Sequence, residues 1–106
     1  MVDEVPLTIE SSTDGGTASV TLAGELDVHT APQVAEVLDG AFESGVTAIT
    51  IDVGRLRFCD SSGIQVLVQA RERALGIDGA VVLTGVQGTV EKVLSVTGLL
   101  ELFAAP

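Results

Sequence analysis

Aromatic side chains are scarce in this sequence of 106 residues, which has three Phe and no Trp or Tyr. The hydrophobic core must therefore be built mainly from Ala, Val, Leu and Ile, which supply most of the 46% of residues that are hydrophobic. A chain of this length buries enough surface to fold alone. We therefore expect one domain that spans residues 1–106.

Basic residues are also scarce, because 5 Lys and Arg stand against 15 Asp and Glu, for a formal net charge of −10 at pH 7. Nucleic-acid binding depends on Lys and Arg that neutralise phosphates. Attraction to anionic membrane surfaces depends on the same two residue types. The composition argues against both kinds of partner and favours a protein partner with a basic face.

Cysteine is nearly absent as well, and the single Cys59 cannot form an internal disulfide. No apolar run reaches the length of a membrane-spanning helix. The first four residues, Met-Val-Asp-Glu, are acidic, whereas a secretory signal peptide begins with positive charge. We expect a cytoplasmic protein that does not enter the membrane.

The motifs of common catalytic sites are missing. His29 is the only histidine, and the Gly-x-Ser-x-Gly motif that presents a nucleophilic serine is absent. The only lysine, Lys92, does not lie in a phosphate-binding loop motif. No cluster of His, Cys and carboxylates has the spacing of metal ligands. We therefore expect no enzyme activity, no cofactor and no metal site.

The spacing of apolar residues predicts strands and helices in the order β-β-α-β-α-β-α-β. Strands are expected over residues 7–10, 17–23, 48–53, 80–84 and 99–104. Helices are expected over residues 30–45 and 89–97, and from the segment 60–63 to residue 76. This alternation predicts an α/β fold with a mixed sheet of four to five strands and right-handed crossovers. The continuous apolar run at 80–84 is typical of a strand covered on both faces.

The segment 53–63 joins an apolar strand to an amphipathic helix. It places Asp60, Ser61 and Ser62 over the free N–H groups of a helix N-terminus, which favour negative charge. A serine in this place can cap the helix, act as a nucleophile or carry a phosphate. Ser62 followed by Gln65 fits a capping box, and Asp60 is the cap in a slightly shifted frame. Only one cap is needed, so one serine remains for another role.

A second loop precedes the first predicted helix. Thr30 and Gln33 again fit a capping box at the start of that helix. Asp27 and His29 lie just before it. Because this loop follows the carboxyl end of a strand, as the segment 60–63 does, we expect the two segments to lie on the same edge of the sheet.

Three segments, in this order along the chain, resemble the bacterial anti-sigma factor antagonists, a family with the STAS fold. They are Leu-Ala-Gly-Glu-Leu-Asp at 22–27, Phe-Cys-Asp-Ser-Ser-Gly at 58–63 and Val-Thr-Gly-Leu at 96–99. The likeness covers nearly the whole chain and implies a STAS-like domain. In that family the residue after the motif's aspartate accepts a phosphate, which implies Ser61 as the acceptor and Ser62 as the second choice.

The resemblance also implies a partner-switching mechanism that regulates transcription, as in a stress response or in sporulation. The unmodified chain is expected to bind an anti-sigma factor that is also a serine kinase, which releases a sigma factor. The kinase then transfers phosphate from ATP to Ser61, the complex dissociates, and a serine phosphatase resets the chain. The alternative is a phosphorylation-independent STAS scaffold module in a larger sensory complex. The expected partner-binding residues are Asp27, His29, Asp60, Ser61, Ser62 and Gly63.

Each of these residues also has a simpler interpretation. Asp27 is a turn residue, His29 is a solvated loop residue, and Asp60 is an ordinary helix-start carboxylate. Gly63 either lets a partner's backbone approach or only permits a tight entry into the helix. Cys59 is either a buried, inert thiol or a redox-active one whose pKa the helix N-terminus lowers, although the adjacent carboxylate opposes such a shift.

Overall fold

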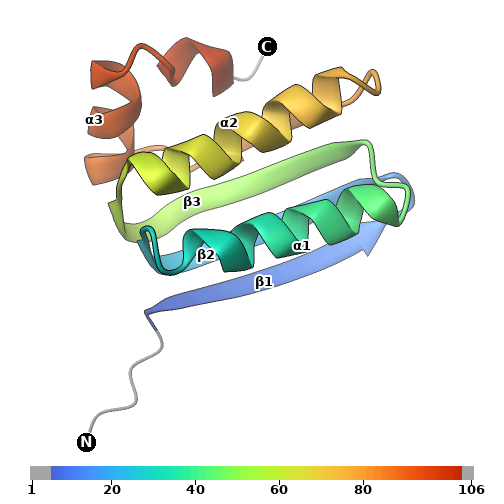
Figure 1. The fold of residues 1–106 in the computed structure, drawn as a ribbon, viewed down its shortest axis with the longest axis horizontal. Coiled ribbons are helices and arrows are strands. Elements are labelled where there is room, and N and C mark those ends of the chain that lie inside the picture. The colour runs from blue at the N-terminus through green and yellow to red at the C-terminus, as the bar shows by residue number, and fades with distance from the viewer. Residues whose placement is uncertain (1–5, 104–106) are drawn as a thin grey trace, which may run out of the picture.

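Four strands form one mixed sheet in the computed structural model, which describes residues 6–103 (Figure 1). They are β1 (Leu7–Asp14), β2 (Thr17–Leu26), β3 (Ala48–Cys59) and β4 (Ala80–Thr84), in the order β1-β2-β3-β4. The pair β1–β2 is an antiparallel hairpin, and β2–β3 and β3–β4 are parallel. The predicted fold class is thus confirmed, with four strands.

Three helices accompany the sheet: α1 (Ala31–Glu43), α2 (Ser61–Leu75) and α3 (Gly88–Val96). Helices α1 and α2 lie side by side across one face of the sheet, while α3 lies beside the start of α2, where β3 ends (Figure 1). The predicted fifth strand is wrong, because residues Leu100–Phe103 form a 3-10 helix, η1, which packs against α3 and β4. Residue 104, the last of that predicted strand, lies outside the described residues.

The core lies between the sheet and the helices α1 and α2. Alternate residues of the two central strands are buried there, namely Ala18, Val20 and Leu22 of β2 and Ile49, Ile51 and Val53 of β3. From the helices, Val34, Leu38 and Phe42 of α1 and Ile64, Leu67 and Ala70 of α2 face them. The apolar Leu75, by contrast, is 53% exposed at the end of α2.

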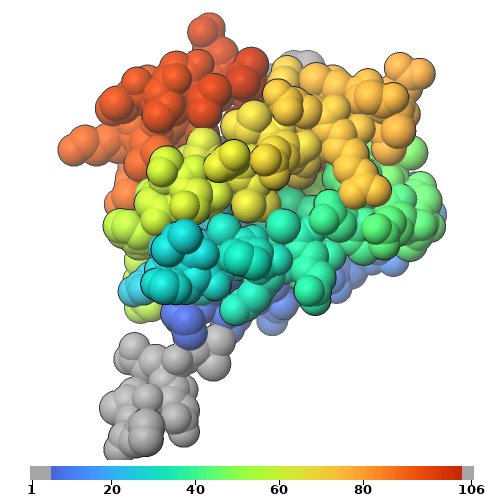
Figure 2. Space-filling model, in the orientation of Figure 1, coloured from blue at the N-terminus to red at the C-terminus, as the bar shows by residue number. Residues whose placement is uncertain are grey.

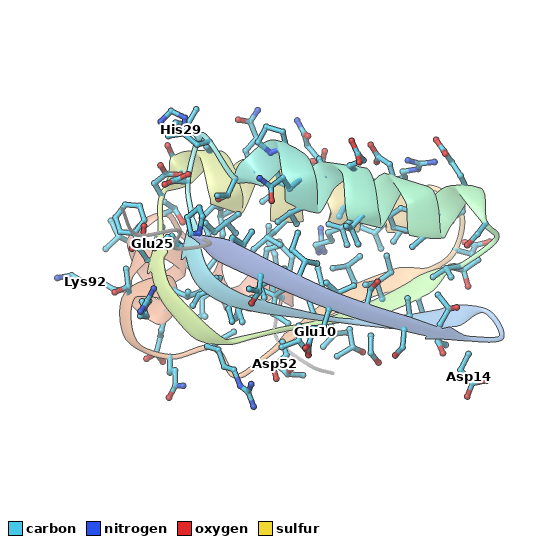
Figure 3. All side chains as sticks on the ribbon, turned by 90° about the horizontal axis from the view of Figure 1, so that it is seen from below. Glu10, Asp14, Glu25, His29, Asp52 and Lys92 are labelled. Atoms are coloured by element: carbon cyan, nitrogen blue, oxygen red, sulfur yellow. The ribbon has the colours of Figure 1, made fainter. Side chains whose placement is uncertain are left out.

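The opposite face of the sheet is polar, and neither α1 nor α2 covers it. Glu10 and Asp52 lie on the side of the sheet away from α1 (Figure 3). The strand register aligns Ser12, Ser19 and Thr50 in a neighbouring row. Strand β4 is therefore an edge strand with one buried face, carrying Val81 and Leu83, and the expectation that it is covered on both faces is wrong.

Strand β3 continues well past its predicted end at residue 53. The arginines of the segment 54–57 are typical of a loop, but this segment still pairs with β2 through two register shifts. The pairing ends with Glu25 opposite Phe58 and Leu26 opposite Cys59. The added length carries the end of β3 to the end of β2, which positions the site described below. Within residues 6–103, none of the helices has the length and apolar character needed to cross a bilayer.

Candidate functional site

Two loops meet at the edge of the sheet where β2 and β3 end. The backbone N–H of Asp60 donates to the carbonyl of Leu26, with 3.2 Å between N and O. On the surface, the turn between β2 and α1 (cyan) lies next to the start of α2 (yellow-green) at one end of the molecule (Figure 2). This is the shared edge that the strand topology predicts for residues 27–30 and 60–63.

Asp60 caps helix α2. Its Oδ1 accepts hydrogen bonds from the backbone N–H groups of Ser62 at 2.9 Å and Gly63 at 3.2 Å. The cap of α2 is therefore Asp60, which is the second of the two predicted alternatives. The predicted capping box of Ser62 with Gln65 is wrong, because Ser62 already lies inside the helix. A cap of this type is worth about 0.5–2 kcal/mol.

Ser61 is the first residue of α2, and its side chain is exposed. Because Asp60 takes the two N–H groups that a capping side chain would use, the Ser61 hydroxyl is not needed for capping. It lies at the positive end of the helix dipole, where an added phosphate is favoured by about 0.3–1 kcal/mol. Ser62 is half-buried by comparison. Of the two serines, Ser61 is the one that another protein can reach more easily.

Gly63 is buried, and the structure gives a reason for glycine within the chain itself. A β-carbon at this position would overlap Cγ of Leu26 and lie 3.2 Å from Sγ of Cys59. The start of α2 therefore packs with its backbone directly on the end of β2. Of the two interpretations of Gly63, this internal close approach fits the tight entry into the helix.

A hydrogen-bonded turn joins β2 to α1. Oδ1 of Asp27 accepts from the backbone N–H groups of His29 at 2.9 Å and Thr30 at 3.1 Å. The Thr30 hydroxyl donates to the carbonyl of Glu25 and accepts from the N–H of Asp27, both at 2.9 Å. The predicted capping box of Thr30 with Gln33 is therefore wrong, because Thr30 is 2% exposed and its hydroxyl is used inside the turn. Asp27 has the geometry of a turn residue, and His29 is exposed.

The carboxyl group of Asp27 remains ionised at neutral pH. Partial desolvation raises its pKa, but the N–H groups of His29 and Thr30 and the Thr30 hydroxyl together outweigh that effect and hold the pKa below its ordinary value of 3.8. A negative charge is therefore fixed in this turn, next to the helix start that carries Ser61. This charge suits a basic partner face.

Cys59 is buried directly beneath the site. Burial, with a smaller effect of the negative charge of Asp60, raises the pKa of the Cys59 thiol to about 11. A thiol reacts as its thiolate, so this cysteine is inert at neutral pH. The structure supports the interpretation as an inert thiol over the redox one.

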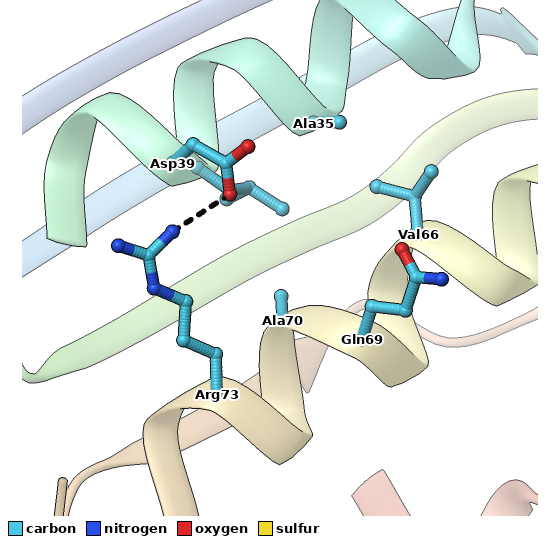
Figure 4. Close-up of a pocket in the computed structure, with 7 residues that line it drawn as sticks. Ala35, Asp39, Val66, Gln69, Ala70 and Arg73 are labelled. Atoms are coloured by element: carbon cyan, nitrogen blue, oxygen red, sulfur yellow. Dashed lines mark hydrogen bonds and ion pairs between the residues drawn. The ribbon is translucent and has the colours of Figure 1, made fainter. Parts of the chain in front are cut away.

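A hollow of about 160 Å³ lies between α1 and α2, away from this edge (Figure 4). Arg73 bridges its rim to Asp39 at 2.9 Å, and the Arg73 guanidinium lies 5.0 Å from the centre of the Phe42 ring. Leu38 and Ala70 also line the hollow. Across residues 6–103, no three His, Cys, Asp or Glu side chains are grouped so as to hold a metal ion. The arrangement around Ser61 is therefore the better candidate for a functional site.

Comparison with known proteins identifies the family. The model of the STAS domain matches residues 8–106. The anti-sigma-B factor antagonist of Staphylococcus aureus is 29% identical over 96 residues, which are 91% of this chain and 89% of that protein. The structure of the anti-sigma factor antagonist SpoIIAA in its unphosphorylated form is similar with a TM-score of 0.78 and 29% identity, over 87% of this chain and 82% of that one.

The structure of the Bacillus cell-fate determinant SpoIIAA in its phosphorylated form is similar with a TM-score of 0.71 and 30% identity. This match covers 88% of this chain and 84% of that one. The family model thus spans nearly all of the chain, and the relatives share its sheet and helices. The chain belongs to the STAS domain family, among the anti-sigma factor antagonists.

Proposed function

We propose that this chain binds an anti-sigma factor while Ser61 is unmodified, and that phosphorylation of Ser61 ends the binding. The observation that carries the proposal is the exposed Ser61 hydroxyl at the first position of α2, outside the capping interaction that Asp60 makes. A similar protein, SpoIIAA, has been solved in both an unphosphorylated and a phosphorylated form, which is consistent with such a modification. Release of the anti-sigma factor's sigma factor is the expected result of binding.

In the proposed reaction the anti-sigma factor is a serine kinase that brings ATP. Oγ of Ser61 attacks the γ-phosphorus, an O–P bond forms, and the bond between that phosphorus and the ADP oxygen breaks. The hydroxyl proton leaves to a base of the kinase. The chain supplies the acceptor hydroxyl. Two hydrogen bonds from N–H groups to the Asp60 carboxylate fix the start of α2 and thereby hold Ser61 in place. A serine phosphatase returns the hydroxyl by hydrolysis.

The switch acts on the interface and leaves the fold unchanged. The Ser61 side chain lies on the surface, so a phosphate there displaces no core residue. It adds between about 1.5 and 2 negative charges at pH 7. A partner face that fits a neutral hydroxyl must then desolvate a dianion, which is costly when no cation is placed to pair with it. The acidic Asp27 and Asp60 nearby add repulsion on this side of the interface.

Phosphorylation with purified kinases and ATP tests the proposal. We expect the kinase that binds the chain to add one phosphate, which mass spectrometry locates on Ser61. Ser61→Ala should block the modification and keep the binding, while Ser62→Ala should permit both. Ser61→Asp should weaken binding with little change in melting temperature, although it carries one charge where phosphate carries nearly two.

Two results would count against this mechanism. Phosphate that still arrives on Ser61→Ala but is lost in Ser62→Ala would make Ser62 the acceptor. Tight binding without any phosphate on either serine would favour the scaffold module that works without phosphorylation.

A further inference from the structure

Two large apolar side chains are exposed at the edge that carries Ser61. Val28 is 60% exposed in the turn between β2 and α1, and Phe58 is 44% exposed near the end of β3. His29 follows Val28 in the sequence, and Glu25 pairs with Phe58 in the sheet. Both labelled residues lie at the same end of the molecule (Figure 3).

Both side chains are held by rigid backbone. Val28 lies inside the turn in which Asp27 accepts from two N–H groups and from which the buried Thr30 hydroxyl bonds back to β2. Phe58 lies in the β2–β3 ladder opposite Glu25, directly before the buried Cys59. Neither residue needs to order its backbone when a partner binds. Such preorganisation lowers the entropic cost of association.

Both positions lie close to the start of α2. Phe58 precedes Ser61 by three residues, so their Cα atoms are at most about 11 Å apart. Val28 follows Leu26 by two residues, and the Leu26 carbonyl accepts from the N–H of Asp60, the neighbour of Ser61. An interface of ordinary size, with about 800 Å² buried on each partner, is wide enough to reach all three residues.

We propose that Val28 and Phe58 are the apolar anchors by which the unmodified chain binds its anti-sigma factor. The partner then has two apolar recesses, with Lys or Arg placed opposite Glu25 and Asp27. An apolar centre with a polar, charged rim is the usual anatomy of such an interface. The chain's net charge of −10 favours a basic rim on the partner. This inference rests on the proposed function.

The anchors also explain why a phosphate on Ser61 ends the binding. Apolar contacts near the hydroxyl reduce its access to water once the partner is docked. In such a site a dianion loses part of its hydration, which costs free energy unless a partner cation pairs with it directly. When an anchor is weakened, more water reaches the interface, so a charge at Ser61 lowers the magnitude of the binding free energy by a smaller amount.

Serine substitutions at the two anchors test the inference. The probe is the purified anti-sigma factor kinase of the host that binds the wild-type chain, and the readout is the dissociation constant. We expect Val28→Ser and Phe58→Ser each to raise it by about 10- to 30-fold, the effect of losing a hot-spot residue. Leu75→Ser is the matched control, because Leu75 is 53% exposed at the far end of α2 and should change the constant less than twofold.

A second measurement separates an anchor from a residue that only supports the fold. Ser61→Asp is introduced into the wild-type chain and into Val28→Ser, and the loss of affinity is compared. We expect a smaller loss in the Val28→Ser background, with unchanged melting temperature.

Two outcomes overturn the inference and are distinguishable. In the first outcome, Ser61→Asp weakens binding, but neither Val28→Ser nor Phe58→Ser changes the dissociation constant by more than twofold. This result overturns the inference and leaves the proposed function intact. A wild-type chain that binds none of the host's anti-sigma factor kinases overturns the proposed function and the inference together.

Discussion

Gly63 and Leu26 share a space that has room for only one side chain. A β-carbon on Gly63 would overlap Cγ of Leu26 and lie 2.8 Å from its Cδ2. Leu26 is fully buried at the end of β2, so it has little room to move away. The contact sets how closely the start of α2 approaches the sheet, and thereby where Ser61 lies.

We expect Gly63→Ala to destabilise the protein by about 1–3 kcal/mol, because the methyl group forces a shift of Leu26 or of the helix. Urea denaturation followed by circular dichroism measures the change. The matched control is Gly40→Ala in α1, where a β-carbon meets nothing within 4 Å. This control should stabilise by about 0.5–1 kcal/mol, since alanine is the better helix former. Equal effects of both substitutions would contradict the close-packing argument.

Loss of the helix cap should be measurable at Asp60. Asp60→Ala leaves the N–H groups of Ser62 and Gly63 without their acceptor, so we expect a loss of about 0.5–2 kcal/mol in the free energy of unfolding. Ser62→Ala should stay within about 0.5 kcal/mol of the wild type. A larger loss from Ser62→Ala than from Asp60→Ala would restore the serine as the cap.

The turn at Asp27 should make the stability depend on acid pH. Because the folded-state pKa of Asp27 lies below the ordinary value of 3.8, the unfolded chain takes up the proton first as the pH falls. The contribution of this carboxylate is therefore present above the unfolded pKa and lost as the pH falls through the folded pKa. Denaturation curves between pH 6 and 2 measure the effect, with Asp27→Asn as the control that keeps an acceptor oxygen without the charge. An equally steep loss in Asp27→Asn would assign the pH dependence to other groups.

The Cys59 thiol should resist alkylation. Its pKa of about 11 and its burial leave almost no reactive thiolate at pH 8, so iodoacetamide should modify it only after unfolding. A Ser19→Cys variant supplies an exposed thiol as a positive control. The raised pKa also predicts a stability that is full below the unfolded value of 9.0 and declines as the pH rises toward 11. Rapid modification of native Cys59 would show that the start of α2 opens readily.

The sequence is sufficient for the order of the first seven elements but not for their ends or for the eighth element. The apolar spacing predicted the four strands and the three helices, since these patterns reflect burial against the core. Strand β3 was predicted too short because the arginines of the segment 54–57 are typical of a loop, whereas pairing with β2 depends on contacts distant in sequence. The largely apolar segment 99–104 predicts a strand, but short segments of this kind do not distinguish strand from helix. In the structure, Phe103 is buried and the carbonyl of Leu102 accepts from Nε of Arg71.

At the candidate site, the sequence predicts that the two segments lie on one edge of the sheet, but it misassigns single hydrogen bonds. Ser62 and Thr30 both fit a capping pattern, yet the cap of α2 is Asp60, two residues before Ser62, and the Thr30 hydroxyl is used inside the turn. The exposure of Val28 and Phe58 has no signal in the sequence, because apolar residues are expected inside. Only the path of the backbone shows that these two side chains are left at the surface.

The uncovered polar face of the sheet has a practical consequence for experiments. Ser19 faces outward there, and it precedes the end of β2 by seven residues, or about 23 Å of strand. A fluorescent dye or a surface tether attached through Ser19→Cys would therefore sit well away from Ser61. Because native Cys59 is shielded, labelling would be confined to one position, and complex formation could be followed in real time with a reporter outside the contact area.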